Sequence, residues 1–201
     1  DELSLSAYAE HRAKWAPWLR TVVGLRIDHF RTTDRDRLTG IVGRQDSSLL
    51  QPKASLIIAP WPHTEFTISA GRGFHSNDAR AGLVDDGQGG ASLVRPPLLV
   101  ESNSYEAGLR TNVVPHLTLT ATAFQADFAS ELTYSADAGQ TEAGRPSRRR
   151  GVEFTAQYRP APWLEINGNL AFSHARYRDG PLANRFIEDA PGFIEIGRAH
   201  V

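Results

Sequence analysis

The side chains of this chain that could bind a ligand or a metal lie in its polar stretches. These stretches separate short segments in which apolar and polar residues alternate. His75 and Asp78 are three residues apart just beyond such a segment, and Arg80 follows. An imidazole and a carboxylate at this spacing can ligate a metal or contact a polar ligand. In the alternative interpretation this is a polar loop in which Asn77 and Asp78 shape a turn. We predict no metal site, and we keep His75, Asp78 and Arg80 as candidates for ligand contact at the mouth of a loop.

Three consecutive arginines form a second candidate site. Arg148, Arg149 and Arg150 follow a long polar stretch that we expect to be a loop. A guanidinium binds phosphate through two parallel hydrogen bonds, so the run could recognise an anionic ligand or the phosphates of lipopolysaccharide. The alternative is a solvated loop base paired with its own carboxylates. Both interpretations remain open, and we keep all three arginines as candidate ligand-binding residues.

No catalytic constellation is found in the sequence. Gly71-Arg72-Gly73 follows an alternating segment but precedes no helical pattern, which excludes a dinucleotide-binding turn. Asp34-Arg35-Asp36 lacks the spacing and the glycine of a calcium loop. The chain has no cysteine, which excludes thiol chemistry, and its net charge of -1 gives no reason to expect a nucleic-acid partner. We therefore predict a protein that is not an enzyme and that uses no cofactor.

Alternation of apolar and polar residues is the main structural signal. In the segment Gly151 to Tyr158, Val152 and Phe154 fall on one face and Glu153 and Thr155 on the other, a period of two that no helix can use. The same pattern occurs eight times, with the start of a ninth near Phe193. The predicted strands cover about 3–10, 19–30, 53–59, 65–74, 105–111, 117–132, 151–158 and 164–174.

The connections between these strands alternate strictly between short and long. Tight breaks fall at Pro17, Pro60 to Pro62, Pro115 and Pro160 to Pro162, where proline ends a strand. The long polar connections are 32–50, 75–98, 133–150 and 176–191. A β-propeller or a β-sandwich repeats strands without this alternation. An up-and-down barrel of the outer membrane has short turns at one end and long loops at the other.

Composition permits a barrel in a membrane. The chain of 201 residues is 40% hydrophobic, with a mean hydropathy of -0.37, which resembles a soluble protein. A barrel strand places an apolar residue only at every second position, so these values do not exclude it. No run of about 18 apolar residues is present, which excludes a transmembrane helix.

Charged residues recur on one face of these strands. Arg20, Arg26 and Asp28 share a face of an otherwise apolar segment, and unpaired charge is costly to bury, so that face must meet water or partners. We predict that this face lines the lumen of a barrel. The predicted lumen-facing residues are Arg20, Arg26, Asp28, Glu106, Arg110 and Glu153.

The four tryptophans give an independent indication. Trp15, Trp18, Trp61 and Trp163 all lie beside a short turn. An indole is apolar yet carries an N–H group that requires a polar partner, which suits the membrane interface. We predict a tryptophan girdle at the end of the short turns. The alternative is that the indoles cap the core of a soluble sandwich.

One predicted strand has an irregular pattern. Leu117, Leu119 and Ala121 are apolar at odd positions, whereas Phe124 and Phe128 are apolar at even ones. Either a β-bulge shifts the register, or threonines face lipid near the short turn. The sequence does not decide between these two.

Four motifs in this order resemble the barrel of TonB-dependent outer-membrane receptors. These are Gly71-Arg72-Gly73-Phe74-His75-Ser76-Asn77-Asp78-Ala79-Arg80, Ser104-Tyr105-Glu106-Ala107-Gly108-Leu109-Arg110, Ala123-Phe124-Gln125-Ala126-Asp127-Phe128 and Ser147-Arg148-Arg149-Arg150-Gly151-Val152-Glu153. The resemblance covers nearly all of residues 1–194. It implies an all-β, antiparallel up-and-down transmembrane barrel segment. Family members combine a 22-stranded barrel with an N-terminal plug that carries an energy-coupling box.

The resemblance implies a function and partners. It implies a receptor in the Gram-negative outer membrane that binds and imports a ferric siderophore, another metal chelate or a cobalamin-like molecule. Its partners would be outer-membrane lipid, lipopolysaccharide and, through the plug, the TonB complex. We expect residues 1–194 to be part of the barrel, without the plug, and 195–201 to be a non-native tail. A passive porin is the first alternative, and a soluble β-propeller or sandwich that binds a ligand is the second.

Overall fold

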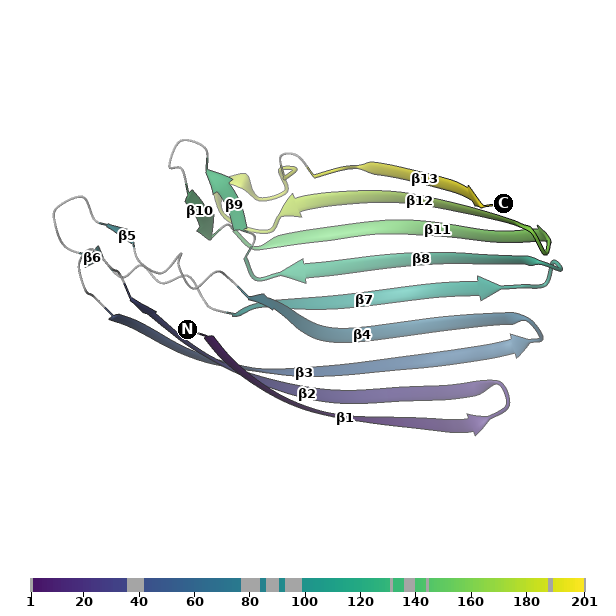
Figure 1. The fold of residues 1–201 in the computed structure, drawn as a ribbon, viewed down its shortest axis with the longest axis horizontal. Coiled ribbons are helices and arrows are strands. Elements are labelled where there is room, and N and C mark those ends of the chain that lie inside the picture. The colour runs from purple at the N-terminus through teal and green to yellow at the C-terminus, as the bar shows by residue number, and fades with distance from the viewer. Residues whose placement is uncertain are drawn as a thin grey trace.

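Nine of the thirteen strands that the computed structural model describes form a single antiparallel sheet, in the order β1-β2-β3-β4-β7-β8-β11-β12-β13 (Figure 1). The structure describes residues 2–35, 42–76, 84–85, 91–92, 99–130, 132–135, 140–143, 145–187 and 190–200. The sheet strands are β1 (Glu2–Ala16), β2 (Leu19–Arg35), β3 (Val42–Trp61), β4 (Thr64–Ser76), β7 (Leu99–Thr111), β8 (Leu117–Phe128), β11 (Ser147–Ala161), β12 (Leu164–Tyr177) and β13 (Phe193–His200). The predicted all-β fold, with eight strands and a ninth, is confirmed.

Small elements lie within the connections predicted to be loops. A hairpin joins β5 (Val84–Asp85) and β6 (Ala91–Ser92), and another joins β9 (Leu132–Ser135) and β10 (Gln140–Ala143). A single turn of 3-10 helix covers Gly180–Leu182. In the described part of the chain no helix is long and apolar enough to cross a membrane.

Short turns join the strands at one end of the sheet, on the right of Figure 1, and the longer connections lie at the other end. The short turns fall between β1 and β2, β3 and β4, β7 and β8, and β11 and β12. His63 and His116, in two of them, adopt the left-handed backbone region, with φ of 65° and 64°. The predicted alternation of short and long connections is therefore present.

The strands extend further toward the long connections than the sequence predicts. The predicted loop 32–50 is largely a continuation of the β2–β3 hairpin, in which Thr32 pairs with Gln45 and Asp34 with Gly43. The loops predicted after His75, before Arg150 and after Arg176 are likewise shortened by β4, β11 and β12. Strand pairing satisfies backbone N–H and C=O groups whatever the side chains, so a polar stretch can stay in the ladder. Polarity was therefore a poor guide to where these strands end.

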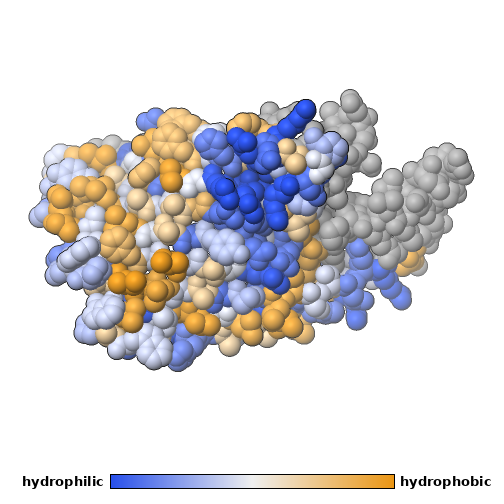
Figure 2. Space-filling model, turned by 180° about the vertical axis from the view of Figure 1, so that it is seen from behind, coloured by the Kyte–Doolittle hydropathy of each residue, from blue (hydrophilic) through white to orange (hydrophobic). Residues whose placement is uncertain are grey.

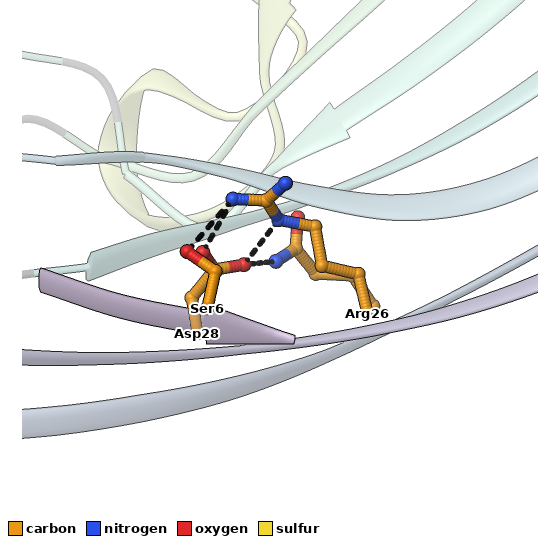
Figure 3. Close-up of polar contacts among 4 residues, drawn as sticks. Ser6, Arg26 and Asp28 are labelled. Atoms are coloured by element: carbon orange, nitrogen blue, oxygen red, sulfur yellow. Dashed lines mark hydrogen bonds and ion pairs between the residues drawn. The ribbon is translucent and has the colours of Figure 1, made fainter. Parts of the chain in front are cut away.

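The two faces of the sheet differ in chemistry. Asp28 is 1% exposed and Thr32 3% exposed on one face of β2, whereas Leu25 and Ile27 on the other are 49% exposed. We call the face of Asp28 the inward face, because its side chains point into the hollow of the curved sheet (Figure 3). The opposite face is the outward face. The outward apolar set comprises Leu19, Val23, Leu25, Ile27, Phe154, Ile166 and Leu170.

Strand β8 contains neither of the irregularities that its sequence suggests. It pairs with β7 and β11 in continuous register, without a bulge, so Leu119 and Ala121 face outward and Thr120 and Phe124 inward. The ring of Phe124 lies against Gly151, where an added Cβ would stand 2.7 Å from Cζ. Because Gly151 has no side chain, a large ring fits on the inward face. The two explanations offered for this strand, a bulge or lipid-facing threonines, are both wrong.

Candidate functional site

Among the ion pairs described on the inward face, that between Arg26 and Asp28 contains the most buried side chain (Figure 3). Nε and Nη2 of Arg26 each donate to one carboxylate oxygen of Asp28, both at 2.7 Å. Nη2 also donates to Oγ of Ser6 on β1 at 3.0 Å. Gln51 on β3 donates to the same carboxylate. A carboxylate that is 1% exposed thus has partners from two strands, as a buried charge requires.

Three further ion pairs lie on the inward face of strands β1 to β4. Arg20 on β2 pairs with Glu65 on β4. Glu10 on β1 accepts from Arg12 at 2.7 Å and from Lys53 on β3 at 2.5 Å. Lys53 reaches Glu10 by passing over Gly24, where an added Cβ would stand 2.4 Å from Cε of the lysine. The glycine therefore leaves the space in which β1 and β3 are joined across β2.

The remaining predicted lumen residues share this face. Glu106 and Arg110 lie on β7, opposite Ser69 and Glu65 of β4, and Glu153 lies on β11, opposite Thr122. Register places all six predicted residues on the inward face, and Arg26 contacts Asp28, two residues away on the same strand. Arg20 meets Glu65, which the sequence analysis did not single out.

The three arginines of β11 do not act as one loop-base cluster. They lie within a strand, so their side chains alternate between the faces. Arg149 faces inward, and its guanidinium carbon stands 5.6 Å from the ring centroid of Phe128. Arg148 and Arg150 face outward, opposite Asp127 and Gln125. The ladder continues to Ser147, so the run lies at the start of β11, and Arg148 pairs with the carboxylate of Asp127 at 2.5 Å, as the interpretation of a paired loop base expects.

The other candidates for ligand contact are only partly described. The backbone of His75 belongs to β4 and pairs with Val100, a residue that is 1% exposed. Asp78 and Arg80 lie outside the described residues. Among the residues that the structure does describe, no group of three or more histidine and acidic side chains could hold a metal ion.

The tryptophans gather at the end of the short turns. Trp15, Trp18, Trp61 and Trp163 are between 51% and 67% exposed, and each lies in or next to one of the short turns. Nε1 of Trp15 donates to Oγ1 of Thr21 at 2.8 Å. Trp61 packs edge to face against Phe66, with ring centroids 5.9 Å apart. Large amphipathic rings are therefore exposed at one level of the sheet.

Several inward-facing partners were missed by the sequence analysis. They are polar residues at inward positions of their strands: Ser6, Glu10, Arg12, Gln51, Lys53 and Glu65. The spacing along each strand could have identified them, because side chains two or four positions apart in a strand lie on the same face, and each of these residues has that spacing to another inward residue. Which of these side chains contact each other across strands depends on the strand register, and alternation alone does not determine the register.

Nine antiparallel strands with an apolar outward face, a charged inward face and short turns at one end are the geometry of an outer-membrane barrel. The family model described as "TonB dependent receptor-like, beta-barrel" matches residues 1–192. The chain belongs to this family. The predicted family is thereby confirmed, and with it the outer-membrane location that its members share.

Solved structures of this family have the same fold. The ferric-catecholate import receptor Fiu of E. coli K12 aligns with 98% of this chain and 32% of its own, at 17% identity and a TM-score of 0.73. The ferric yersiniabactin uptake receptor FyuA of Yersinia pestis aligns with 98% of this chain and 31% of its own, at 16% identity and a TM-score of 0.74. The siderophore receptor PiuA of Acinetobacter baumannii aligns with 96% and 30%, at 14% identity and 0.74.

These comparisons decide between the classes considered. The chain spans about a third of the length of these receptors. No curated protein sequence matches it. The family and its solved neighbours are receptors and transporters, so the protein is not an enzyme. The alternative of a soluble propeller or sandwich is wrong, since the TonB-dependent receptor barrel crosses a membrane with its strands.

Proposed function

We propose that this segment is part of a longer receptor, the parent receptor, which binds a scarce ligand and imports it actively across the Gram-negative outer membrane. The family match over residues 1–192 carries the proposal. The ligand would be a ferric siderophore, another metal chelate or a cobalamin-like molecule. Solved neighbours named as a ferric-catecholate import receptor, a ferric yersiniabactin uptake receptor and a copper transporter support the siderophore and metal members of this range.

The two faces of the sheet would serve different parts of this task. The inward network of Arg20, Arg26 and Asp28, with Glu106, Arg110 and Glu153, would line the aqueous lumen, where its charges meet water, one another or a plug. That plug would lie in the rest of the parent receptor and would contact the TonB complex. Residues 1–194 would form the barrel portion and 195–201 a non-native tail, the first six residues of which continue β13 and pair with β12.

The ligand would first meet the end of the sheet that carries the long connections. The backbone of His75 lies in β4 near that end, and Arg149 faces inward near the same end of β11. With Asp78 and Arg80 they form our candidate set for ligand contact. An inward guanidinium suits the carboxylate or catecholate oxygens of a metal chelate, because it donates to planar oxygen pairs.

Uptake with and without a proton gradient tests this function. Cells that express the parent receptor would be given ⁵⁵Fe bound to a catecholate, ⁵⁵Fe bound to a hydroxamate, labelled copper or labelled cobalamin. We expect accumulation of at least one of these above receptor-free cells, and its loss when an uncoupler collapses the gradient. Uptake that continues with the uncoupler would instead establish the passive porin.

We also propose that Trp15, Trp18, Trp61 and Trp163 form the girdle at the periplasmic membrane interface. Replacing Trp61 by alanine removes an indole at this level together with its edge-to-face contact with Phe66. We expect the free energy of unfolding of the parent receptor in phospholipid vesicles to fall by about 0.5–1.5 kcal/mol. Trp61→Phe, which keeps a ring against Phe66, should lose less. An unchanged urea midpoint for Trp61→Ala would contradict the girdle.

A further inference from the structure

The short-turn end of the sheet carries two copies of one sequence motif. Pro60-Trp61-Pro62-His63-Thr64-Glu65 and Pro160-Ala161-Pro162-Trp163-Leu164-Glu165 both have the pattern Pro-x-Pro-x-x-Glu, and in both a residue with a flat ring follows the second proline. The first copy connects β3 to β4, and the second connects β11 to β12. Two hairpins therefore present the same residue types at the same end of the sheet.

Each motif lines a cleft together with the turn of the preceding hairpin. The first cleft has a volume of about 490 Å³ and includes Trp18 of the β1–β2 turn. The second has a volume of about 580 Å³ and includes His116 of the β7–β8 turn. We call them the rim clefts. Both have the size of sites that hold a small molecule or one unit of a polymer.

Charge is balanced in both rim clefts. Each is lined by one glutamate and one arginine: Glu65 and Arg110 in the first, Glu165 and Arg159 in the second. Glu65 and Arg110 lie opposite each other on the inward face, away from lipid, and Arg159 binds Glu165 at 2.6 Å. Figure 2 shows mostly apolar and weakly polar atoms toward this end, whereas the strongly hydrophilic area lies nearer the segments drawn in grey. The clefts thus offer hydrogen-bond donors and acceptors without the excess of cations that attracts phosphate.

The backbone at this rim is already hydrogen-bonded between neighbouring turns. The N–H group of Ala59 donates to the carbonyl oxygen of Trp18 at 2.7 Å, and that of Arg159 donates to the carbonyl oxygen of His116 at 2.9 Å. A peptide that added to the sheet as a further strand would need such groups to be free. Recognition in the rim clefts must therefore come from side chains.

Flat rings beside planar hydrogen-bonding groups suit a sugar. One face of a sugar ring consists of C–H groups, which pack on an indole or a proline ring, and its edge carries hydroxyl and acetamido groups, which carboxylates and guanidinium groups bind. The two clefts are four strand spacings apart, about 19 Å along the sheet, so a polymer can enter both at once. The short turns of an outer-membrane barrel face the periplasm. We propose that the rim clefts bind the glycan chains of peptidoglycan, the polymer of N-acetylated amino sugars in that compartment. This inference goes beyond the proposed import of a ligand.

Sedimentation with purified, insoluble peptidoglycan tests the rim clefts. The parent receptor would be prepared in detergent as wild type, as Glu65→Ala, as Glu165→Ala, as the double variant of these two, and as Glu10→Ala. We expect each single variant to bind about tenfold more weakly, because it loses charged hydrogen bonds and attachment at two points, and the double variant not to bind above background. Glu10 is also an inward glutamate in an ion pair, with Arg12 at 2.7 Å, but it lines neither cleft, so Glu10→Ala should bind as the wild type does.

Competition with the wild type gives a second measurement that needs no variant. Soluble oligosaccharides of N-acetylglucosamine should release the receptor from peptidoglycan, whereas a proline-rich peptide should not. Equal sedimentation of the double variant and the wild type would overturn the glycan site, as would equal loss in Glu10→Ala or release by the peptide alone. Heat-modifiable migration in gels must be the same for all five proteins, which shows that the barrels are folded.

Uptake by the wild type separates this inference from the proposed function. A wild type that imports its ligand but does not sediment with peptidoglycan refutes the rim clefts alone. A wild type that sediments with peptidoglycan but imports none of the labelled ligands refutes the import function alone.

Discussion

Ile68→Arg is expected to destabilise the parent receptor by about 2–4 kcal/mol, the cost of an arginine at the midplane on the lipid face of a barrel. Ile68 is 58% exposed on the outward face of β4. Its cross-strand neighbours are Leu56 and Ala107, and Phe66 and Ala70 flank it on the same face. A guanidinium there has hydrocarbon around it and no acidic partner in register. Urea unfolding in phospholipid vesicles, together with the yield of assembled receptor in the outer membrane, measures the effect.

Thr67→Arg is the matched control, one residue away on the same strand. Thr67 lies on the inward face, where Glu65 is two residues away along β4 and Glu106 is opposite the next inward residue, Ser69. An arginine there meets water and carboxylates, so we expect a change within about 0.5 kcal/mol, as for ordinary solvated positions. Equal destabilisation by the two variants would show that the faces do not meet different solvents, and the membrane assignment would fail with it.

Much of this fold was predictable because alternation carries information about both faces at once. Leu25 and Ile27 alternate with Arg26 and Asp28. In a strand with that pattern, one face must carry the apolar side chains and the other face the charged ones. Proline at the short turns then divided the chain into hairpins. Those two signals were sufficient for the order of the nine strands, since consecutive strands of a meander are neighbours.

The ends of the strands were not predictable from the same pattern. Beyond the membrane both faces of a hairpin meet water, so the alternation that marks a strand disappears while the backbone pairing continues. Thr33 and Arg44 show this, because they face each other in register within a stretch predicted to be a loop. The consequence for the site was direct: the arginines at 148–150 moved from a loop into a strand, and the run was divided between two faces.

Strand β8 shows a second limit. Its inward positions change from threonine to phenylalanine without any change of register. A prediction that assigns polar residues to one face and apolar residues to the other cannot describe such a strand. Two residues of the neighbouring strand β11 explain how these rings fit. Gly151 leaves room for the ring of Phe124, and the guanidinium of Arg149 stands over the ring of Phe128. Contacts between residues about 20 to 30 positions apart decide these orientations. A lumen that is polar overall can therefore hold aromatic rings where a glycine or a guanidinium receives them.

Removing the side chain of Arg26 is expected to lower the stability of the parent receptor strongly, and a second substitution should partly restore it. In Arg26→Ala the carboxylate of Asp28, which is 1% exposed in the native chain, keeps, of the contacts described above, only the amide of Gln51. A buried charge without its partner costs several kcal/mol, and because the Arg26 side chain is 48% exposed, solvent will offset part of this. We expect a loss of about 2–3 kcal/mol in the free energy of unfolding of the parent receptor.

The double variant Arg26→Ala/Asp28→Asn decides whether the buried charge is the cause. An asparagine keeps an oxygen for Gln51 to donate to and removes the charge, so the double variant should be more stable than Arg26→Ala alone. Asp28→Asn by itself should lose less than Arg26→Ala, because the half-exposed guanidinium that remains can be hydrated. If the two substitutions instead add, the pair contributes through packing alone, and the inward face does not depend on matched charge at this position. Urea unfolding of all four proteins in vesicles gives the cycle directly.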